Sequence, residues 1–316
     1  MRRYIKIKHT YQRVLKFIIT DIWHLDLTEL SIMRARMVRY LKVLIITIRG
    51  FNSDKVGLQA VNLSFFSALA VVPFVALMFT ITKGFGLAQK LENLLLTYFS
   101  DNEEIIEYIL QFANNVIKSG QNGFFGAISF VFLLWTVIWL MLCIEKSFND
   151  IWKVVDHRSI GKRTLYYILL LLVSPLIVLI FMSLGLIYSD ALKSVGLEID
   201  RFIPVTSIFT WLTFYLLVSF VFTLMYYFIP YIKVKFSAAF NSSLIVSFAF
   251  VVTQFFYLET QILVSGLNAV YGVFAAIPLF LVWMNISWTM ILFGAELSHA
   301  YQNVDNYNIQ NVTLKN

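Results

Sequence analysis

The sequence has few of the residues on which catalysis and disulfide cross-linking usually depend. It contains one cysteine, Cys143, which excludes a disulfide within the chain, and its four histidines stand apart from one another and from pairs of acidic residues. Metal sites need such ligands close together. The chain also lacks a Walker A loop, a GxSxG elbow and a CxxC pair. We therefore expect no catalytic residues, no metal, no cofactor and no enzymatic activity.

Charge is scarce and unevenly placed. Only 14% of the residues are charged and 59% are hydrophobic, whereas about 25% of residues are charged in soluble domains. All 25 Lys and Arg avoid six apolar stretches, which are 59–82, 123–144, 165–188, 205–228, 243–265 and 273–295. Each stretch can cross a hydrocarbon core of ~30 Å as a helix. The sequence predicts an all-α, polytopic membrane bundle of six transmembrane helices.

The positive charges alternate between the connecting segments. Twenty Lys and Arg lie in residues 1–58, in the loops 145–164 and 229–242 and in the C-terminal tail, against five in 83–122, 189–204 and 266–272. The positive-inside rule then places both termini in the cytoplasm and 83–122 outside. We expect a basic cytoplasmic or interfacial extension (1–58), a six-helix domain (59–300) and a short cytoplasmic tail (301–316).

An amphipathic helix is predicted over residues 30–48, before the first crossing. Its apolar face consists of Leu30, Met33, Met37, Leu41, Leu44 and Ile48, and Arg34, Arg39, Lys42 and Arg49 lie around the other side. Such a helix fits the membrane surface, with anionic lipid headgroups as its partners. The alternative is a cytosolic helix packed on the bundle. The large apolar side chains and the basic polar face favour the membrane surface.

The external segment 83–122 predicts two short amphipathic helices. Leu87, Leu91, Leu94 and Leu95 form the apolar side of the first. The second covers 105–113, after N-cap residues at 100–102. These helices can cap the bundle or lie on the outer leaflet, and the sequence leaves both interpretations open.

Polar residues inside the apolar stretches mark candidate functional positions, because polar groups are costly in hydrocarbon. The fifth stretch carries Ser243, Ser247, Gln254 and Gln261 at steps of four, seven and seven, and the sixth carries Asn285, Thr289 and Glu296 at steps of four and seven. Each set lies on one helix face. We predict that Gln254, Asn285, Thr289 and Glu296 line a polar path or headgroup groove. The alternative is hydrogen bonding between helices, worth about 0.6 kcal/mol per contact.

Glu259 is the single acid within the apolar part of a predicted crossing. It projects nearly opposite the fifth-stretch polar face and close to the outer end. It is a fifth candidate, as a protonatable gate or cation site. The alternative is that its carboxylate reaches the outer interface.

Several short motifs follow one another in order along residues 50–300. They are Leu58-Gln59-Ala60-Val61-Asn62-Leu63-Ser64-Phe65-Phe66 with Val72-Pro73, Leu134-Trp135-Thr136, Phe148-Asn149-Asp150-Ile151-Trp152 with Lys162-Arg163, Tyr227-Phe228-Ile229-Pro230, Tyr271-Gly272, Trp283 and Gly294-Ala295-Glu296-Leu297. With this order and spacing the chain resembles the YihY/virulence factor BrkB family of bacterial membrane proteins. It departs from the family pattern at Asn241, at Glu259 and in its longer N-terminal extension.

The resemblance implies a six-helix, multi-pass protein of the bacterial cytoplasmic (inner) membrane. Relatives have carried a ribonuclease label, but metal-dependent RNA hydrolysis needs clustered His and Asp ligands. We expect no nucleic-acid partner. The leading hypothesis is a transporter or flippase-like exporter of a lipid or other envelope-related amphiphile. The alternative is a non-transporting scaffold that binds envelope proteins. An enzyme acting on lipids would need a buried catalytic pair. The substrate and the oligomeric state stay open.

Overall fold

The computed structural model describes residues 21–23, 31–98, 124–154, 205–265 and 269–307, with single residues and short runs between 110 and 179. Throughout these residues the regular structure is helical and contains no strand, as predicted. Five helices are long and apolar enough to cross a membrane. They are α3 (Val56–Gly84), α6 (Phe124–Ile151), α8 (Val205–Phe228), α9 (Phe236–Ser265) and α10 (Ala269–Asn303).

These five helices cover five of the six predicted crossings. The third predicted crossing, 165–188, falls largely outside the described residues, so the count of six and the cytoplasmic placement of both termini stay predictions. Some helices run well past the apolar stretches, because adding a residue to an existing helix costs little. The 35 residues of α10 span about 52 Å at a 1.5 Å rise. Its last turns therefore extend beyond a hydrocarbon core of ~30 Å.

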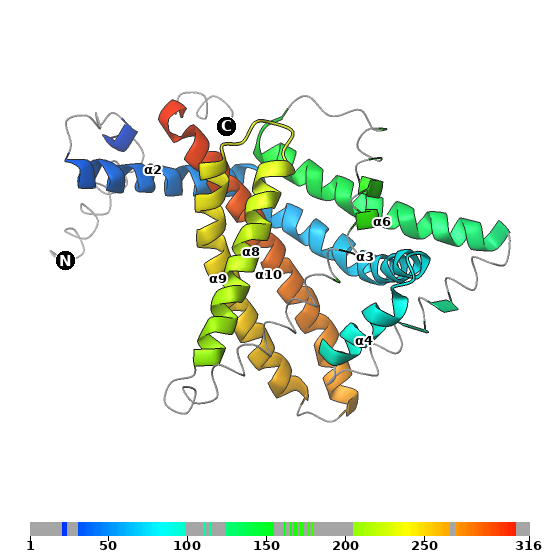
Figure 1. The fold of residues 1–316 in the computed structure, drawn as a ribbon. Coiled ribbons are helices and arrows are strands. Elements are labelled where there is room, and N and C mark those ends of the chain that lie inside the picture. The colour runs from blue at the N-terminus through cyan, green and yellow to red at the C-terminus, as the bar shows by residue number, and fades with distance from the viewer. Residues whose placement is uncertain are drawn as a thin grey trace.

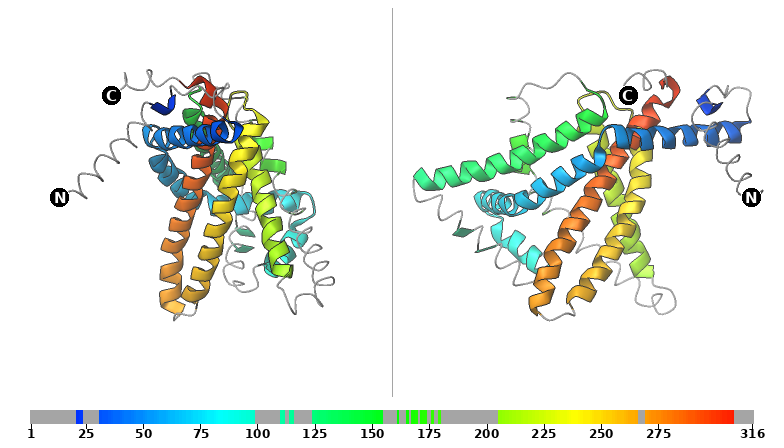
Figure 2. Two further views of the ribbon diagram at one scale, coloured as in Figure 1. Left: turned by 90° about the vertical axis from the view of Figure 1, so that its left-hand side faces the viewer. Right: turned by 180° about the vertical axis from the view of Figure 1, so that it is seen from behind.

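The helices form two groups that meet along α10. In Figures 1 and 2, α8, α9 and α10 run side by side, while α3 and α6 run together toward the other side at a steep angle to them. The helix α2 (Ile32–Ser53) crosses the end of this arrangement, beside the C-terminal end of α10. Contacts join α10 to α2, α3, α6, α8 and α9. The polar residues of α10 therefore face several different neighbours.

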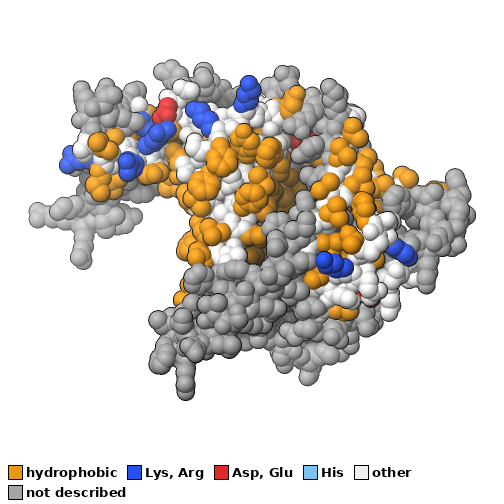
Figure 3. All heavy atoms as spheres, in the orientation of Figure 1, with side chains coloured by type: hydrophobic (Ala, Val, Ile, Leu, Met, Phe, Trp, Pro, Cys, Tyr) orange, Lys and Arg blue, Asp and Glu red, His pale blue; other side chains and the backbone are white. Residues whose placement is uncertain are grey.

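Two clusters of buried apolar side chains hold the described helices together. One joins the ends of α2, α3 and α6 to α8, α9 and α10, with the aromatic rings of Phe148, Phe222 and Tyr226 at its centre. The other lies at the far end of α3, where Leu77 packs with Leu133 and Val137 of α6. Large apolar side chains also cover the outside of the bundle (Figure 3), as expected for helices that face lipid.

A helix, α2, forms over most of the range predicted for 30–48, but the side that it buries is not the predicted apolar side. Its predicted apolar residues Met33, Met37, Leu41, Leu44 and Ile48 are exposed. A different face, with Val43, Ile46 and Thr47, is buried against the bundle. Figure 3 shows Lys and Arg side chains gathered around this projecting helix. The bundle contact therefore uses one side of α2, which includes Lys42 of the predicted polar face, and leaves the predicted apolar stripe uncovered. The position of this stripe at a membrane surface stays a prediction.

The predicted external segment begins with a helix that packs on the bundle. The helix α4 (Ala88–Tyr98) places Leu91 and Leu94 in the cluster formed by Ala76, Leu77 and Phe79 of α3. Of the two interpretations left open by the sequence, α4 therefore follows the one in which it caps the bundle. Most of the second predicted helix, 105–113, lies outside the described residues.

Candidate functional site

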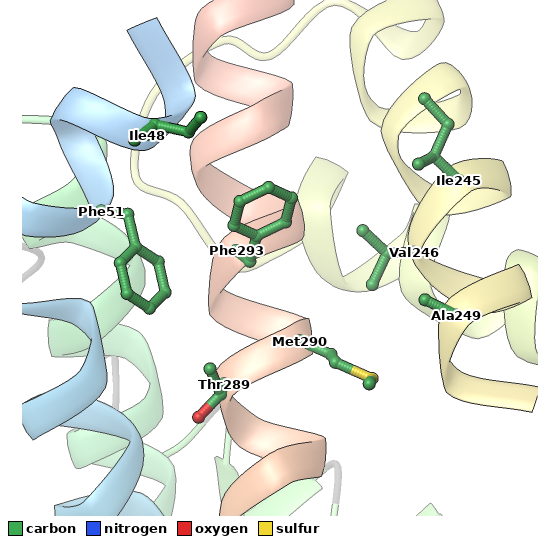
Figure 4. A pocket seen from close by; sticks show the side chains of 8 residues that line it. All are labelled: Ile48, Phe51, Ile245, Val246, Ala249, Thr289, Met290 and Phe293. Carbon is green, nitrogen blue, oxygen red and sulfur yellow. The ribbon is translucent and has the colours of Figure 1, made fainter. Parts of the chain in front are cut away.

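A groove opens between α2, α9 and α10 on the outside of the bundle. It encloses about 300 Å³ and is lined by Ile48, Phe51, Ile245, Val246, Ala249, Thr289, Met290 and Phe293 (Figure 4). The rings of Phe51 and Phe293 meet edge to face at 6.1 Å and join α2 to α10 at this groove. All the lining side chains are apolar except Thr289. Such a lining suits a hydrocarbon chain, because it offers dispersion contacts and almost no hydrogen-bonding groups.

Thr289 is the one predicted path residue that lines this groove. Its hydroxyl donates a hydrogen bond of 2.8 Å to the Asn285 carbonyl one turn earlier in α10. This local bond satisfies the hydroxyl donor within the helix itself. Thr289 therefore presents its methyl group and an already bonded oxygen, which is compatible with an apolar occupant.

Asn285 and Gln254, in contrast, take part in contacts between helices. The Asn285 amide nitrogen donates to the Ser64 hydroxyl of α3 at 3.4 Å. The Trp283 indole nitrogen donates to the Gln254 side-chain oxygen of α9 at 3.0 Å. The Asn285 side chain of α10 thus faces α3, whereas the Gln254 side chain of α9 faces α10. Glu259 is exposed on α9. The structure does not gather these three residues in one place, and their path-lining role stays a prediction.

Glu296 is buried at the end of α10 where α2 joins α3. It is only 1% exposed. Its carboxylate lies directly against Gly50, because a Cβ built at that glycine would be 2.3 Å from the Glu296 Oε2 atom. Any side chain larger than hydrogen at position 50 would therefore require the carboxylate to move. The Glu296 Oε1 atom has no hydrogen-bond partner among the described residues.

Two further charged residues surround Glu296, and the sequence alone did not single them out. Asp54 follows α2, and its carboxyl lies beside that of Glu296. Asp54 also forms an ion pair with Lys153, which follows α6. The Ser53 hydroxyl donates to Asp54 Oδ1 at 3.0 Å. We call Asp54, Lys153 and Glu296, together with Gly50, the corner cluster.

The backbone around the corner cluster is held in an unusual conformation. Lys55 and Lys153 have φ angles of 53° and 54°, in the left-handed region that most residues avoid. Such conformations cost of order 1–3 kcal/mol each. The Gln59 side-chain amide donates to the Asp54 carbonyl at 2.9 Å and helps to hold the turn. These turns bring the ends of α2, α3 and α6 to Glu296.

A second close approach of the same kind involves Gly294, two residues before Glu296 on α10. A Cβ at Gly294 would be 2.0 Å from the Tyr226 hydroxyl oxygen of α8. Tyr226 is fully buried, and its hydroxyl has no hydrogen-bond partner among the described residues. His299, one turn beyond Glu296, packs its ring edge to face on Trp152 at 5.2 Å. The Gly294-Ala295-Glu296-Leu297 motif thus lies where α2, α6 and α8 meet α10.

Comparison with known proteins agrees with this placement of the motifs. The sequence profile described as virulence factor BrkB matches residues 47–313. The chain belongs to the virulence factor BrkB family. The match covers all five described crossings together with the corner cluster and the groove. It therefore confirms the family resemblance seen in the motifs.

The curated relatives of this BrkB-family chain are called UPF0761 membrane proteins. One from Albidiferax ferrireducens is 29% identical over 255 residues, covering 78% of this chain and 59% of its own length. One from Legionella pneumophila is 29% identical, with coverage of 80% and 60%. One from Haemophilus influenzae is 28% identical, with coverage of 80% and 93%. The chain spans about three fifths of the length of the first two. No solved structure matches the chain.

No local sequence pattern marks Gly50, Asp54 or Lys153, and the reason is physical. Gly50 and Asp54 lie about 240 positions before Glu296, and Lys153 lies about 140 positions before it. No local periodicity links residues so far apart. Each also has an ordinary explanation by itself, as a glycine in a helix or a charge in a connecting turn. Only their position around Glu296 distinguishes them.

Proposed function

We propose that this BrkB-family protein moves a lipid or another envelope-related amphiphile across the bacterial cytoplasmic membrane. The observation that carries the proposal is the groove between α2, α9 and α10, with its apolar lining and open side. An acyl chain entering this groove leaves the lipid phase without losing an apolar environment. Thr289, which the sequence predicts to line a path, also lines this groove.

The position of α2 supports an amphiphile as the substrate. Its exposed apolar stripe ends at Ile48, which is itself part of the groove lining. Its exposed Arg34 and Arg36 offer guanidinium groups to anionic headgroups at the same end of the molecule. A lipid with its headgroup at α2 can therefore place a chain in the groove. Any uphill movement would draw on an ion gradient or a separate ATPase.

The test is leaflet exchange of fluorescent lipids in liposomes that contain the purified protein. We expect exchange above that of empty vesicles and a several-fold loss in the Ala249→Phe variant, because the added ring fills the groove. The matched control is Val252→Phe, which places the same ring at an exposed position of α9 outside the groove lining. It should exchange lipids at the original rate.

Two results would contradict the proposal. Equal exchange by the Ala249→Phe and Val252→Phe proteins would exclude the groove as the path. No exchange by well-folded original protein, with fluorescent phosphatidylglycerol and with phosphatidylethanolamine alike, would favour the non-transporting scaffold. A stable stoichiometric partner protein would then be expected.

A further inference from the structure

The corner cluster leaves one buried negative charge without a counter-ion of its own. Glu296 is 1% exposed, and the neighbouring Asp54 side chain is 7% exposed. Lys153 pairs with Asp54 and supplies one positive charge for the two carboxyl groups. Two carboxylates and one ammonium sum to a net charge of −1. An uncompensated charge in a buried site is strongly destabilising.

The geometry places the two carboxyl groups on the same side of the end of α2. Gly50 and Asp54 are one helical turn apart, with the Asp54 backbone nitrogen donating to the Gly50 carbonyl at 2.9 Å. Residues four apart share a helix face. The face of Gly50 that receives the Glu296 carboxylate is therefore the face that carries Asp54. Two carboxyl groups can share a hydrogen bond only when a proton lies between them.

Other titratable groups near the cluster do not supply the missing charge. On α10, His299 lies within electrostatic range of Asp54 and Lys153 and is packed on Trp152. On α8 the nearby group is the neutral phenol of Tyr226, which lies against Gly294. On α9 the titratable residues are Tyr257 and Glu259. Both follow Gln254 on α9, and Gln254 contacts Trp283 of α10. Because Trp283 is more than three turns from Glu296 along α10, Tyr257 and Glu259 are distant from the cluster.

The remaining charged groups belong to the elements that meet at the corner. They are Arg49 beside Gly50, Lys55 beside Asp54, and Glu145, Lys146 and Asp150 in the last turns of α6. Glu145 accepts a hydrogen bond from the Tyr167 hydroxyl, and Lys146 and Asp150 are exposed. Among the described residues, then, Lys153 is the cation that contacts an acid of the cluster.

We propose that Asp54 and Glu296 together bind one proton, with Lys153 as the counter-ion of the pair, and that this proton holds the corner between α2 and α3 against α10. The proton comes from cytoplasmic water and brings the net charge of the cluster from −1 to zero. The ammonium of Lys153 disfavours a metal ion at the same position. No group of three metal-ligating side chains occurs among the residues described here.

Release of the proton would leave two adjacent carboxylates that repel each other in a poorly solvated site. The repulsion acts between Asp54, at the end of α2, and Glu296 of α10. Phe51 and Phe293 lie one turn or less away and join the same two helices at the groove. The proton would thereby control the groove, a consequence that rests on the proposed function. The proton site itself does not depend on it.

The test is infrared difference spectroscopy of the purified protein between neutral and alkaline pH, which detects the C=O stretch of a protonated carboxyl group. We expect a carboxylic acid band that disappears on raising the pH and is missing from the Glu296→Gln protein. The Asp54→Asn protein should lose this band at a different pH, because it lacks the second carboxyl group. Asp150→Asn is the control, since Asp150 is an exposed acid near the same corner. It should leave the band unchanged.

An acid band that is identical in the original, Glu296→Gln and Asp54→Asn proteins would overturn the proposal. If Glu296→Gln does not fold, the Asp54→Asn protein alone tests the proposal. A change in the pH at which the band disappears would support the shared proton, and the same pH as in the original protein would refute it. Lipid exchange separates the two proposals. A band that depends on Glu296 in a protein without lipid exchange would keep the proton site and refute the transport function. Exchange without such a band would do the reverse.

Discussion

At the residue scale, two glycines make room for two buried polar side chains, and Gly294 offers the cleanest test. The Gly294→Ala protein should lose about 1–3 kcal/mol of stability by overpacking, since its Cβ would lie 2.0 Å from the Tyr226 hydroxyl. Adding Tyr226→Phe should restore part of the loss. Gly57→Ala is the control, because that Cβ meets nothing within 4 Å. Thermal unfolding in detergent measures all four proteins, and equal loss in both glycine variants would refute the contact.

At the element scale, α2 combines a face packed on the bundle with an exposed apolar stripe. We expect the stripe to lie in the membrane interface. Spin labels at Met37→Cys and Arg36→Cys, in a Cys143→Ala background, would test this through collision with oxygen, which concentrates in lipid, and with a water-soluble relaxant. The label at 37 should favour oxygen and the label at 36 the relaxant. Water-like collisions at both positions would place α2 in the cytosol.

At the scale of the whole molecule, the structure places the two ends of the described chain together. The Arg39 guanidinium of α2 pairs with the Asp305 carboxylate at 3.0 Å, so α2 and the residues after α10 lie on one side of the bundle, with α4 toward the other. Single cysteines at Asp305 and Gln89, without Cys143, test the orientation. In intact cells an impermeant thiol reagent should label position 89 and spare 305. The opposite labelling would invert the topology predicted from the positive charges.

Some properties of the predicted site residues depend on the neighbouring sequence, and others depend on how the helices pack. The apolar stretches and the amphipathic period of α2 were readable because each depends on neighbouring residues along one helix. The alignment of polar residues along one face of each helix could also be predicted from the sequence. Asn285 faces Ser64 on α3, however, and Gln254 faces Trp283 on α10. Which neighbour a stripe meets depends on helix packing, and that information is not local.

The sequence by itself determined that this is a helical membrane protein, where its described crossings lie, that an amphipathic basic helix precedes them, and to which family it belongs. Each of these follows from composition, periodicity or local motifs. The tertiary structure alone decided that Glu296 lies against Gly50 and beside Asp54, which pairs with Lys153. It also decided that Thr289 lines a groove beside α2. These contacts join three separate parts of the chain. They exist because α10 packs against α2, α3 and α6 at once.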